Sequence, residues 1–164
     1  MKRREYKVKI MKASNFLETD HKLFSDIVAK VYNITEHSCN DYPQYFKWYW
    51  EKTVPGVLKG EKDIFIANVN NEIAGVIILK NEVKEKKICT LYVLEEYRKQ
   101  GIATKLLEEA FKYLGTTKPL VSITEYKLKQ FSSIIKKYDW KETQIILNYY
   151  NKISREIVFN GKLP

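Results

Sequence analysis

The sequence Arg98-Lys99-Gln100-Gly101-Ile102-Ala103 joins a strand-like run to a strongly amphipathic helix. The preceding residues 88–93 are mostly β-branched, aromatic or apolar, a composition that favours a strand. In residues 102–114, apolar side chains recur every three or four positions, which predicts a helix with one buried face. We therefore expect a strand, a basic glycine-containing turn and a helix in direct succession.

This succession predicts an anion site at the start of the helix. Gly101 has no Cβ, so the backbone there can come close to a ligand. The amides of the first helical turn have no acceptors within the helix and lie at its positive end, where they can bind a phosphate. The sequence contains neither GxGxxG nor GxxxxGK[ST], which excludes the two common phosphate loops for dinucleotides and nucleoside triphosphates.

The loop resembles the acyl-CoA-binding motif of the GCN5-related N-acetyltransferase (GNAT) family. After its fourth strand, this family has Arg or Gln, then Gly three positions later, then Gly or Ala two positions after that, and the matching residues here are Arg98, Gly101 and Ala103. Residues 91–97 also resemble the strand and turn that this family has before the loop. The expected order of elements is similar to the family's from about residue 6 to residue 159, and the loop is the specific part of the match. The resemblance implies an acetyl-CoA-dependent N-acetyltransferase that needs no metal.

The resemblance also implies the fold. We expect a mixed α/β acyl-CoA N-acyltransferase fold, with a central, mostly antiparallel twisted sheet of about seven strands flanked by about four helices and splayed between strands 4 and 5. In this family the pantetheine arm of the cofactor lies in the splay and pairs with the fourth strand, which needs free backbone donors and acceptors. The implied cofactor-binding residues are Leu91, Tyr92 and Val93 for pantetheine, and Arg98, Lys99, Gln100, Gly101, Ile102, Ala103 and Thr104 for the pyrophosphate.

The rest of the chain predicts one strand, two helices, three strands, a helix, a strand, a helix and two strands. In the first part of the chain, we expect a strand through Tyr6, Val8 and Ile10 and a helix opened by a capping box of Asn15 and Glu18. A second helix is expected over 42–50, with Pro43 in its first turn and Pro55 and Gly56 stopping it, followed by a hairpin of strands 64–69 and 73–79 around 70–72 and a turn over 80–87. After the helix at 102–114, we expect a strand over 120–123, a helix over 127–137 and strands over 143–150 and 153–159. Without repeats or linkers, residues 1–164 are expected to form one domain.

The chain is strongly basic. Its 29 Lys and Arg residues against 20 Asp and Glu residues give a formal net charge of +9, which favours anionic ligands. Coenzyme A, RNA and an acidic acceptor would each satisfy this preference, and many of the lysines would also suit solvated faces. The sequence has no RNP-type, helix-turn-helix or zinc-finger signature. A basic nucleic-acid-binding protein, or a CoA-binding regulatory protein with little transferase activity, is the alternative function.

Apolar stretches are too short to span a bilayer, and the basic start lacks an apolar signal core, so a soluble, cytoplasmic protein is expected. Cys39 and Cys89 form neither a disulfide framework nor a metal-binding pattern, and Cys89 is expected to be a small buried residue.

The residues that transfer protons are not assigned by the sequence. Many GNAT members have Asn after the fifth strand and, seven residues later, a Tyr that commonly protonates the leaving thiolate. Counting back from Trp140 places Leu128 and Ile135 at these positions. The alternatives are Tyr138, which falls on an apolar stripe, Ser132 and Ser133, or solvent, since a thiolate can take a proton from water near neutral pH.

A general base is equally open, because the fourth-strand run has neither Glu nor His. Glu36 and His37 lie between the first two helices, near where the resemblance implies the acceptor, and His21 is expected at the surface. The aromatic residues of 45–50 occupy too many faces of their helix to be all core. An exposed part is expected to line the acceptor pocket or a dimer seam, and packing in the core is the alternative.

The acceptor amine is also left open. A small amine or antibiotic, an amino acid, a protein N-terminus or lysine, and an aminoacyl-tRNA all fit the resemblance. The reaction it implies is direct transfer in a ternary complex, in which the neutral amine attacks the thioester carbonyl. A homodimer is a further open expectation.

Overall fold

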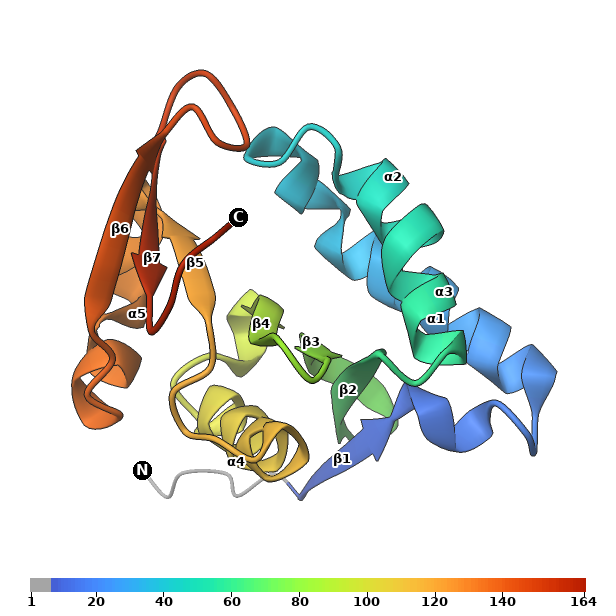
Figure 1. Cartoon of the computed structure of the whole chain (residues 1–164). Coiled ribbons are helices and arrows are strands. Elements are labelled where there is room, and N and C mark those ends of the chain that lie inside the picture. The colour runs from blue at the N-terminus through green and yellow to red at the C-terminus, as the bar shows by residue number, and fades with distance from the viewer. Residues whose placement is uncertain (1–6) are drawn as a thin grey trace, which may run out of the picture.

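A computed structural model describes residues 7–164 of the chain, so Tyr6 of the predicted first strand lies outside the described residues. The first half of the chain forms an antiparallel sheet of β1 (Val8–Lys12), β2 (Lys62–Val69), β3 (Glu72–Asn81) and β4 (Lys86–Val93), in that order (Figure 1). The β2–β3 turn has Asn70 and Asn71 at φ 51° and 65°, the left-handed conformation that a tight hairpin turn needs. The predicted hairpin is confirmed, and β3 and β4 both extend into the expected turn over 80–87.

A second antiparallel sheet is formed by β5 (Val121–Thr124), β7 (Arg155–Phe159) and β6 (Glu142–Leu147), in the order β5-β7-β6. Within residues 7–164 the two sheets are joined by a single parallel bridge, between Lys87 and Leu120. Beyond this bridge, β5 pairs with β7 and turns away from β4. The mixed α/β fold with a splay between strands 4 and 5 is confirmed, with the correction that the strands form two sheets rather than one continuous sheet.

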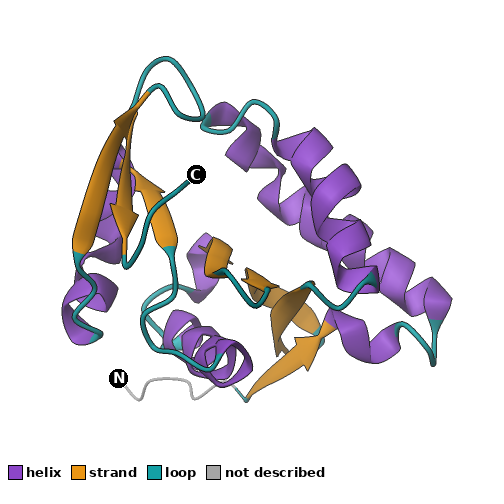
Figure 2. Ribbon diagram, viewed as in Figure 1, coloured by secondary structure: helices purple, strands orange, loops and turns teal. Residues whose placement is uncertain are grey.

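Helices cover both faces of the first sheet (Figure 2). Alternate residues of β2 point to opposite faces: Phe65 and Ala67 pack with α4 (Ile102–Leu114), whereas Ile64 and Ile66 pack with α1 (His21–Thr35). Both sets are buried, which explains the continuous apolar runs of β2 and β3. The helix α5 (Leu128–Lys137) packs beside the second sheet and joins the same core as α4.

The first long helix begins later than predicted. Residues 13–16 form a 3₁₀ turn that contains Asn15, so Asn15 does not open α1. Asp20 does so instead, because its carboxylate accepts a hydrogen bond of 3.0 Å from the amide of Leu23. The capping-box prediction was therefore wrong, while the buried face of the helix agrees with the predicted apolar stripe.

The second helical segment continues through Pro55 and Gly56, contrary to the prediction. It consists of α2 (Tyr45–Trp48), a π turn over Tyr49–Thr53 and α3 (Val54–Leu58). The π turn changes the hydrogen-bond register just before Pro55, so the missing proline amide falls in the first turn of α3, where no intrahelical donor is needed. The helix ends beyond Leu58, and Gly60 then turns the chain at φ 76°.

The last two strands are shorter than predicted, ending and restarting at Leu147 and Arg155. Asn148 has φ 55°, which breaks the extended backbone. Asn151 then organises the loop, because its Oδ1 accepts hydrogen bonds from the amides of Ile153 and Ser154, both at 2.9 Å.

None of the helices within residues 7–164 has the length and apolar character that a membrane-spanning helix needs.

Gly75 tests the packing of α4 on the sheet. A Cβ at this position would lie 3.2 Å from Ile102 Cγ2, from Leu106 Cδ1 and from the carbonyl oxygen of Tyr92. We expect Gly75→Val to lower the free energy of unfolding by about 1–3 kcal/mol, because the larger side chain forces α4 away from the sheet. Urea unfolding would measure this, with Val83→Ala at a 98% exposed site as the control. An unchanged urea midpoint for Gly75→Val would contradict the close packing.

Candidate active site

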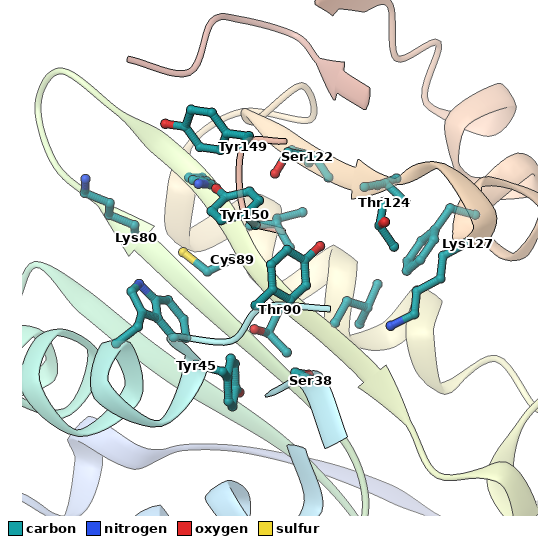
Figure 3. A pocket seen from close by; sticks show the side chains of 18 of the residues that line it. Ser38, Tyr45, Lys80, Cys89, Thr90, Ser122, Thr124, Lys127, Tyr149 and Tyr150 are labelled. Atoms are coloured by element: carbon teal, nitrogen blue, oxygen red, sulfur yellow. The ribbon is translucent and has the colours of Figure 1, made fainter. Parts of the chain in front are cut away.

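A cavity of about 380 Å³ lies where the two sheets diverge (Figure 3). It is lined by side chains from both sheets, from the helical segment that contains α2 and from the β6–β7 loop. The main contributors are residues 88–91 of β4, residues 121–124 of β5, Tyr42, Tyr45 and Trp48, and Tyr149 and Tyr150. The splay implied by the family resemblance is therefore a real cavity.

The backbone of β4 is free along this cavity. Opposite β3, Ile78 pairs with Thr90 and Leu79 with Ile88, which leaves Cys89 as an extra residue in a β-bulge. From Cys89 to Val93, no backbone hydrogen bond to β5 is formed within residues 7–164. This part of β4 is an unpaired edge, and an extended amide ligand can pair with such an edge.

The loop after β4 folds back on the strand. Arg98 Nε donates a hydrogen bond of 2.9 Å to the carbonyl oxygen of Val93, and the guanidinium lies 5.6 Å from the centroid of the Tyr92 ring. The Gln100 side-chain amide donates to the carbonyl oxygen of Glu96 at 3.2 Å. These contacts hold the loop beside the end of β4, and Arg98 as a residue remains exposed.

Gly101 begins α4 in the left-handed conformation, with φ 80°. In the described part of the chain no side chain caps this helix, and a Cβ at Gly101 would have no atom within 4 Å, so the surroundings of Gly101 are open. Lys99 also has a positive φ, of 62°, which the sequence did not predict. Residues 98–104 therefore fit a diphosphate, because they provide the uncapped amides of a helix N-terminus, a nearby cation and room.

Polar contacts cross the gap at the other side of the cavity. Asp41 is 6% exposed and pairs with Lys127 at 2.6 Å, and it also accepts a hydrogen bond from the Tyr126 hydroxyl. The carbonyl oxygen of Asp41 accepts a hydrogen bond of 2.6 Å from the Asn151 amide. We call this group the Asp41 clasp. It connects the loop before α2 to the turn after β5 and to the β6–β7 loop, across a gap that backbone pairing does not close.

Four tyrosines line the cavity, Tyr42, Tyr45, Tyr149 and Tyr150, and sequence reasoning missed most of them as site residues. Tyr149 and Tyr150 were assigned to a strand, but the turn at Asn148 places them in the loop over the cavity, where the rings of Tyr150 and Tyr42 lie 4.9 Å apart. The sequence feature that could have shown this is Asn148 itself, because an Asn before the tyrosine pair favours a turn with positive φ.

The tyrosine hydroxyls are held in their protonated form. Burial raises the pKa of Tyr45 to about 12, and its hydroxyl donates to Thr35 Oγ1 at 2.8 Å. Burial also raises the pKa of Tyr42, whose hydroxyl donates to Glu156 Oε1 at 3.1 Å. Burial raises the pKa of Tyr150 as well, although the charge of Lys87 lowers it in part. At neutral pH these groups are proton donors.

The predicted base candidates do not line the cavity. His37 lies at the loop end of β4, with its ring centroid 4.4 Å from that of Tyr92 and its Nδ1 3.0 Å from the carbonyl oxygen of Ile34. Glu36 is exposed on the same 3₁₀ turn, and His21 is exposed at the first position of α1. Among the described residues, the one carboxylate that lines the cavity is Glu85, which is paired with Lys80 at 3.0 Å.

The candidates on and after α5 are also outside the cavity. Leu128 and Ile135 pack against the core, and Tyr138 packs edge-on against Phe111 with ring centroids 4.8 Å apart. Ser132 and Ser133 are exposed, and the Ser132 hydroxyl donates to the carbonyl oxygen of Lys129. Tyr138 is therefore part of the core, as its position on the apolar stripe of the helix indicated.

The aromatic run over 45–50 divides between core and cavity. Tyr45 and Tyr49 are buried, Trp48 lines the cavity, and Phe46 is 59% exposed. Cys89 is partly exposed to the cavity rather than fully enclosed, and burial raises the pKa of its thiol.

The chain belongs to the Acetyltransferase (GNAT) family, whose model matches residues 26–120. The match spans β4 with its free edge, the following loop and α4. Metal-binding groups of three or more His, Cys, Asp or Glu residues are absent from residues 7–164. The protein is an N-acetyltransferase that uses acetyl-CoA as co-substrate.

Two curated relatives are N-alpha-acetyltransferases. The one from Sulfurisphaera tokodaii is 28% identical over 128 residues, which cover 67% of this chain and 71% of that protein. The one from Saccharolobus solfataricus is 29% identical over 101 residues, which cover 52% of this chain and 60% of that protein.

Solved structures share the fold at lower identity. A GNAT acetyltransferase from Elizabethkingia anophelis with acetyl-CoA bound has a TM-score of 0.53 at 23% identity, covering 68% of this chain and 83% of that chain. The IAA acetyltransferase from Bacillus cereus has a TM-score of 0.57 at 18% identity, covering 93% and 97%.

Gly101→Gln tests the anion site. We expect it to abolish the stabilisation of the protein by acetyl-CoA, because the side chain would enter the open space before α4 and strain a backbone at φ 80°. A thermal-shift titration measures this. Gly115→Gln is the matched control, since Gly115 ends the same helix at φ 72° with equally open surroundings. Unchanged acetyl-CoA affinity in folded Gly101→Gln protein would contradict the site.

Arg98→Ala tests the cation. Its loss should weaken coenzyme A binding by about 1–3 kcal/mol, the range for a charge-assisted phosphate contact. Isothermal titration at two salt concentrations measures this, and Arg98→Lys separates the charge from the bond to Val93. A wild-type affinity that does not depend on salt would place Arg98 outside the site.

Proposed function

We propose that the acceptor is the α-amine at the N-terminus of a peptide or protein. The two curated relatives are N-alpha-acetyltransferases, and their identity of 28–29% with this chain exceeds that of the solved structures described above. We also propose that acetyl-CoA lies along the free edge of β4, from residues 98–104 to Leu91. The open, unpaired edge that leads from this loop into the cavity is the observation that carries the proposal.

The chemistry follows from this arrangement. The neutral α-amine attacks the thioester carbonyl carbon, a C–N bond forms, the C–S bond breaks, and the thiolate of coenzyme A leaves and takes up a proton. The thiolate can take that proton from water or from Tyr150, whose hydroxyl lines the cavity and has a pKa raised by burial. Because the lining carboxylate Glu85 is already paired with Lys80, we propose that the amine loses its proton to water.

The acceptor class is tested with one peptide in two forms. Both forms contain an internal lysine; one has a free α-amine and the other has a formylated N-terminus. We expect thiol release from acetyl-CoA with the free form alone, and mass spectrometry should place the acetyl group on its terminal residue. Modification of the lysine in both forms, or turnover with a small polyamine alone, would overturn the proposal. RNA binding that falls steeply with salt, without thiol release, would favour the nucleic-acid-binding alternative.

A further inference from the structure

Three lysines stand side by side across the first sheet. Lys62 of β2 pairs with Lys80 of β3, and Lys80 pairs with Lys87 of β4, so the three are directly opposite one another in the strand register. Residues paired in this way point to the same face of a sheet, and all three line the cavity. We call them the lysine row. Like charges in directly opposite positions destabilise a sheet, so the row needs a compensating interaction.

Among the described residues, carboxylates pair with the middle lysine alone; Lys87 is hydrogen-bonded to Tyr150 instead, and its pKa is raised although burial opposes this. Lys80 forms ion pairs with Glu82 at 3.3 Å and with Glu85 at 3.0 Å. Neither Lys62 nor Lys87 has a carboxylate within 4 Å in the described part of the chain. The row therefore has an excess of positive charge that faces the cavity.

Lys62 is the most enclosed of these groups. It is 9% exposed, its ammonium lies 4.6 Å from the centroid of the Trp48 ring, and its aliphatic stem passes directly over Gly56. Burial lowers its pKa, and the charges of Lys80 and Lys87 lower it further. An unpaired ammonium in such a place is costly, and an anion delivered by a ligand would remove that cost.

The row lies at the acceptor side of the cavity. Lys87 is near the start of β4, whereas the loop at 98–101 follows its end, and the six residue steps from Lys87 to Val93 span roughly 20 Å. The row is therefore remote from the diphosphate site at the start of α4. An RNA backbone would need an open surface, whereas Lys62 is enclosed, so a small anionic group within the cavity fits better.

We propose that the acceptor carries a carboxylate close to its reactive amine and that this carboxylate binds Lys62 and Lys87. This inference rests on the proposed function and specifies its substrate class: peptides with an acidic side chain at the first or second position. Trp48 and Gly56 position Lys62 for this contact, the first through its ring and the second by leaving room for the stem.

The test compares matched peptides that have Glu or Gln at the first or second position. We expect kcat/KM to be roughly 10- to 100-fold higher for at least one Glu peptide than for its Gln partner. Lys62→Met should bring the two values together, Lys62→Arg should retain part of the preference, and Lys59→Met, an exposed change with the same loss of charge, should leave it unchanged. Lys62→Met is expected to fold, because methionine keeps most of the stem and removes a buried charge.

A second readout separates this inference from the proposed function. Isothermal titration of the same peptides into the protein saturated with coenzyme A measures binding without turnover. Tighter binding of a Glu peptide that is lost in Lys62→Met supports the carboxylate site even where no acetyl transfer occurs, which would overturn the proposed acceptor alone. Turnover with equal Glu and Gln values, or no binding of either peptide, overturns the carboxylate site.

Discussion

The missing backbone pairing between β4 and β5 is the constraint on which the rest of this structure depends. A strand edge inside a protein carries amides and carbonyls that must find partners. Within residues 7–164 the two sheets share one bridge, at Lys87 and Leu120, and then separate, so the edge from Cys89 to Leu91 faces a cavity instead of a strand. The free edge is a binding surface for an extended ligand because its backbone groups are left unpaired.

Keeping the two sheets apart requires other contacts to hold them. On one side, α4 and α5 share a hydrophobic core that includes residues of both sheets. On the other side, the Asp41 clasp joins the loop before α2 to the loops of the second sheet through the carboxylate and the carbonyl oxygen of Asp41. The cavity therefore lies between an apolar contact on one side and a polar contact on the other, and both hold the two sheets apart.

The same separation concentrates charged and polar groups that a closed sheet would not tolerate. Lysines opposite one another on neighbouring strands repel, and they persist here because their face borders the cavity rather than packed side chains. The tyrosines from the β6–β7 loop complete the lining from the second sheet. The proposed ligand contacts are thereby divided along β4, with the loop at 98–104 after one end and the lysine row near the other.

The sequence by itself determined the local features whose physics acts within a few residues: the apolar period of α4, the Asn70–Asn71 hairpin, and the glycine that begins α4 with open amides. It misplaced the start of α1 and the end of α3, because Asp20 and Asn15 are equally good caps in isolation and because a π turn can accommodate Pro55. Only the tertiary structure brought Lys62, Lys87 and Tyr150 to one cavity and left Glu36, His37 and Ser132 outside it. These side chains lie far apart in the chain, and strand register and sheet separation, which no local pattern encodes, decide which of them meet.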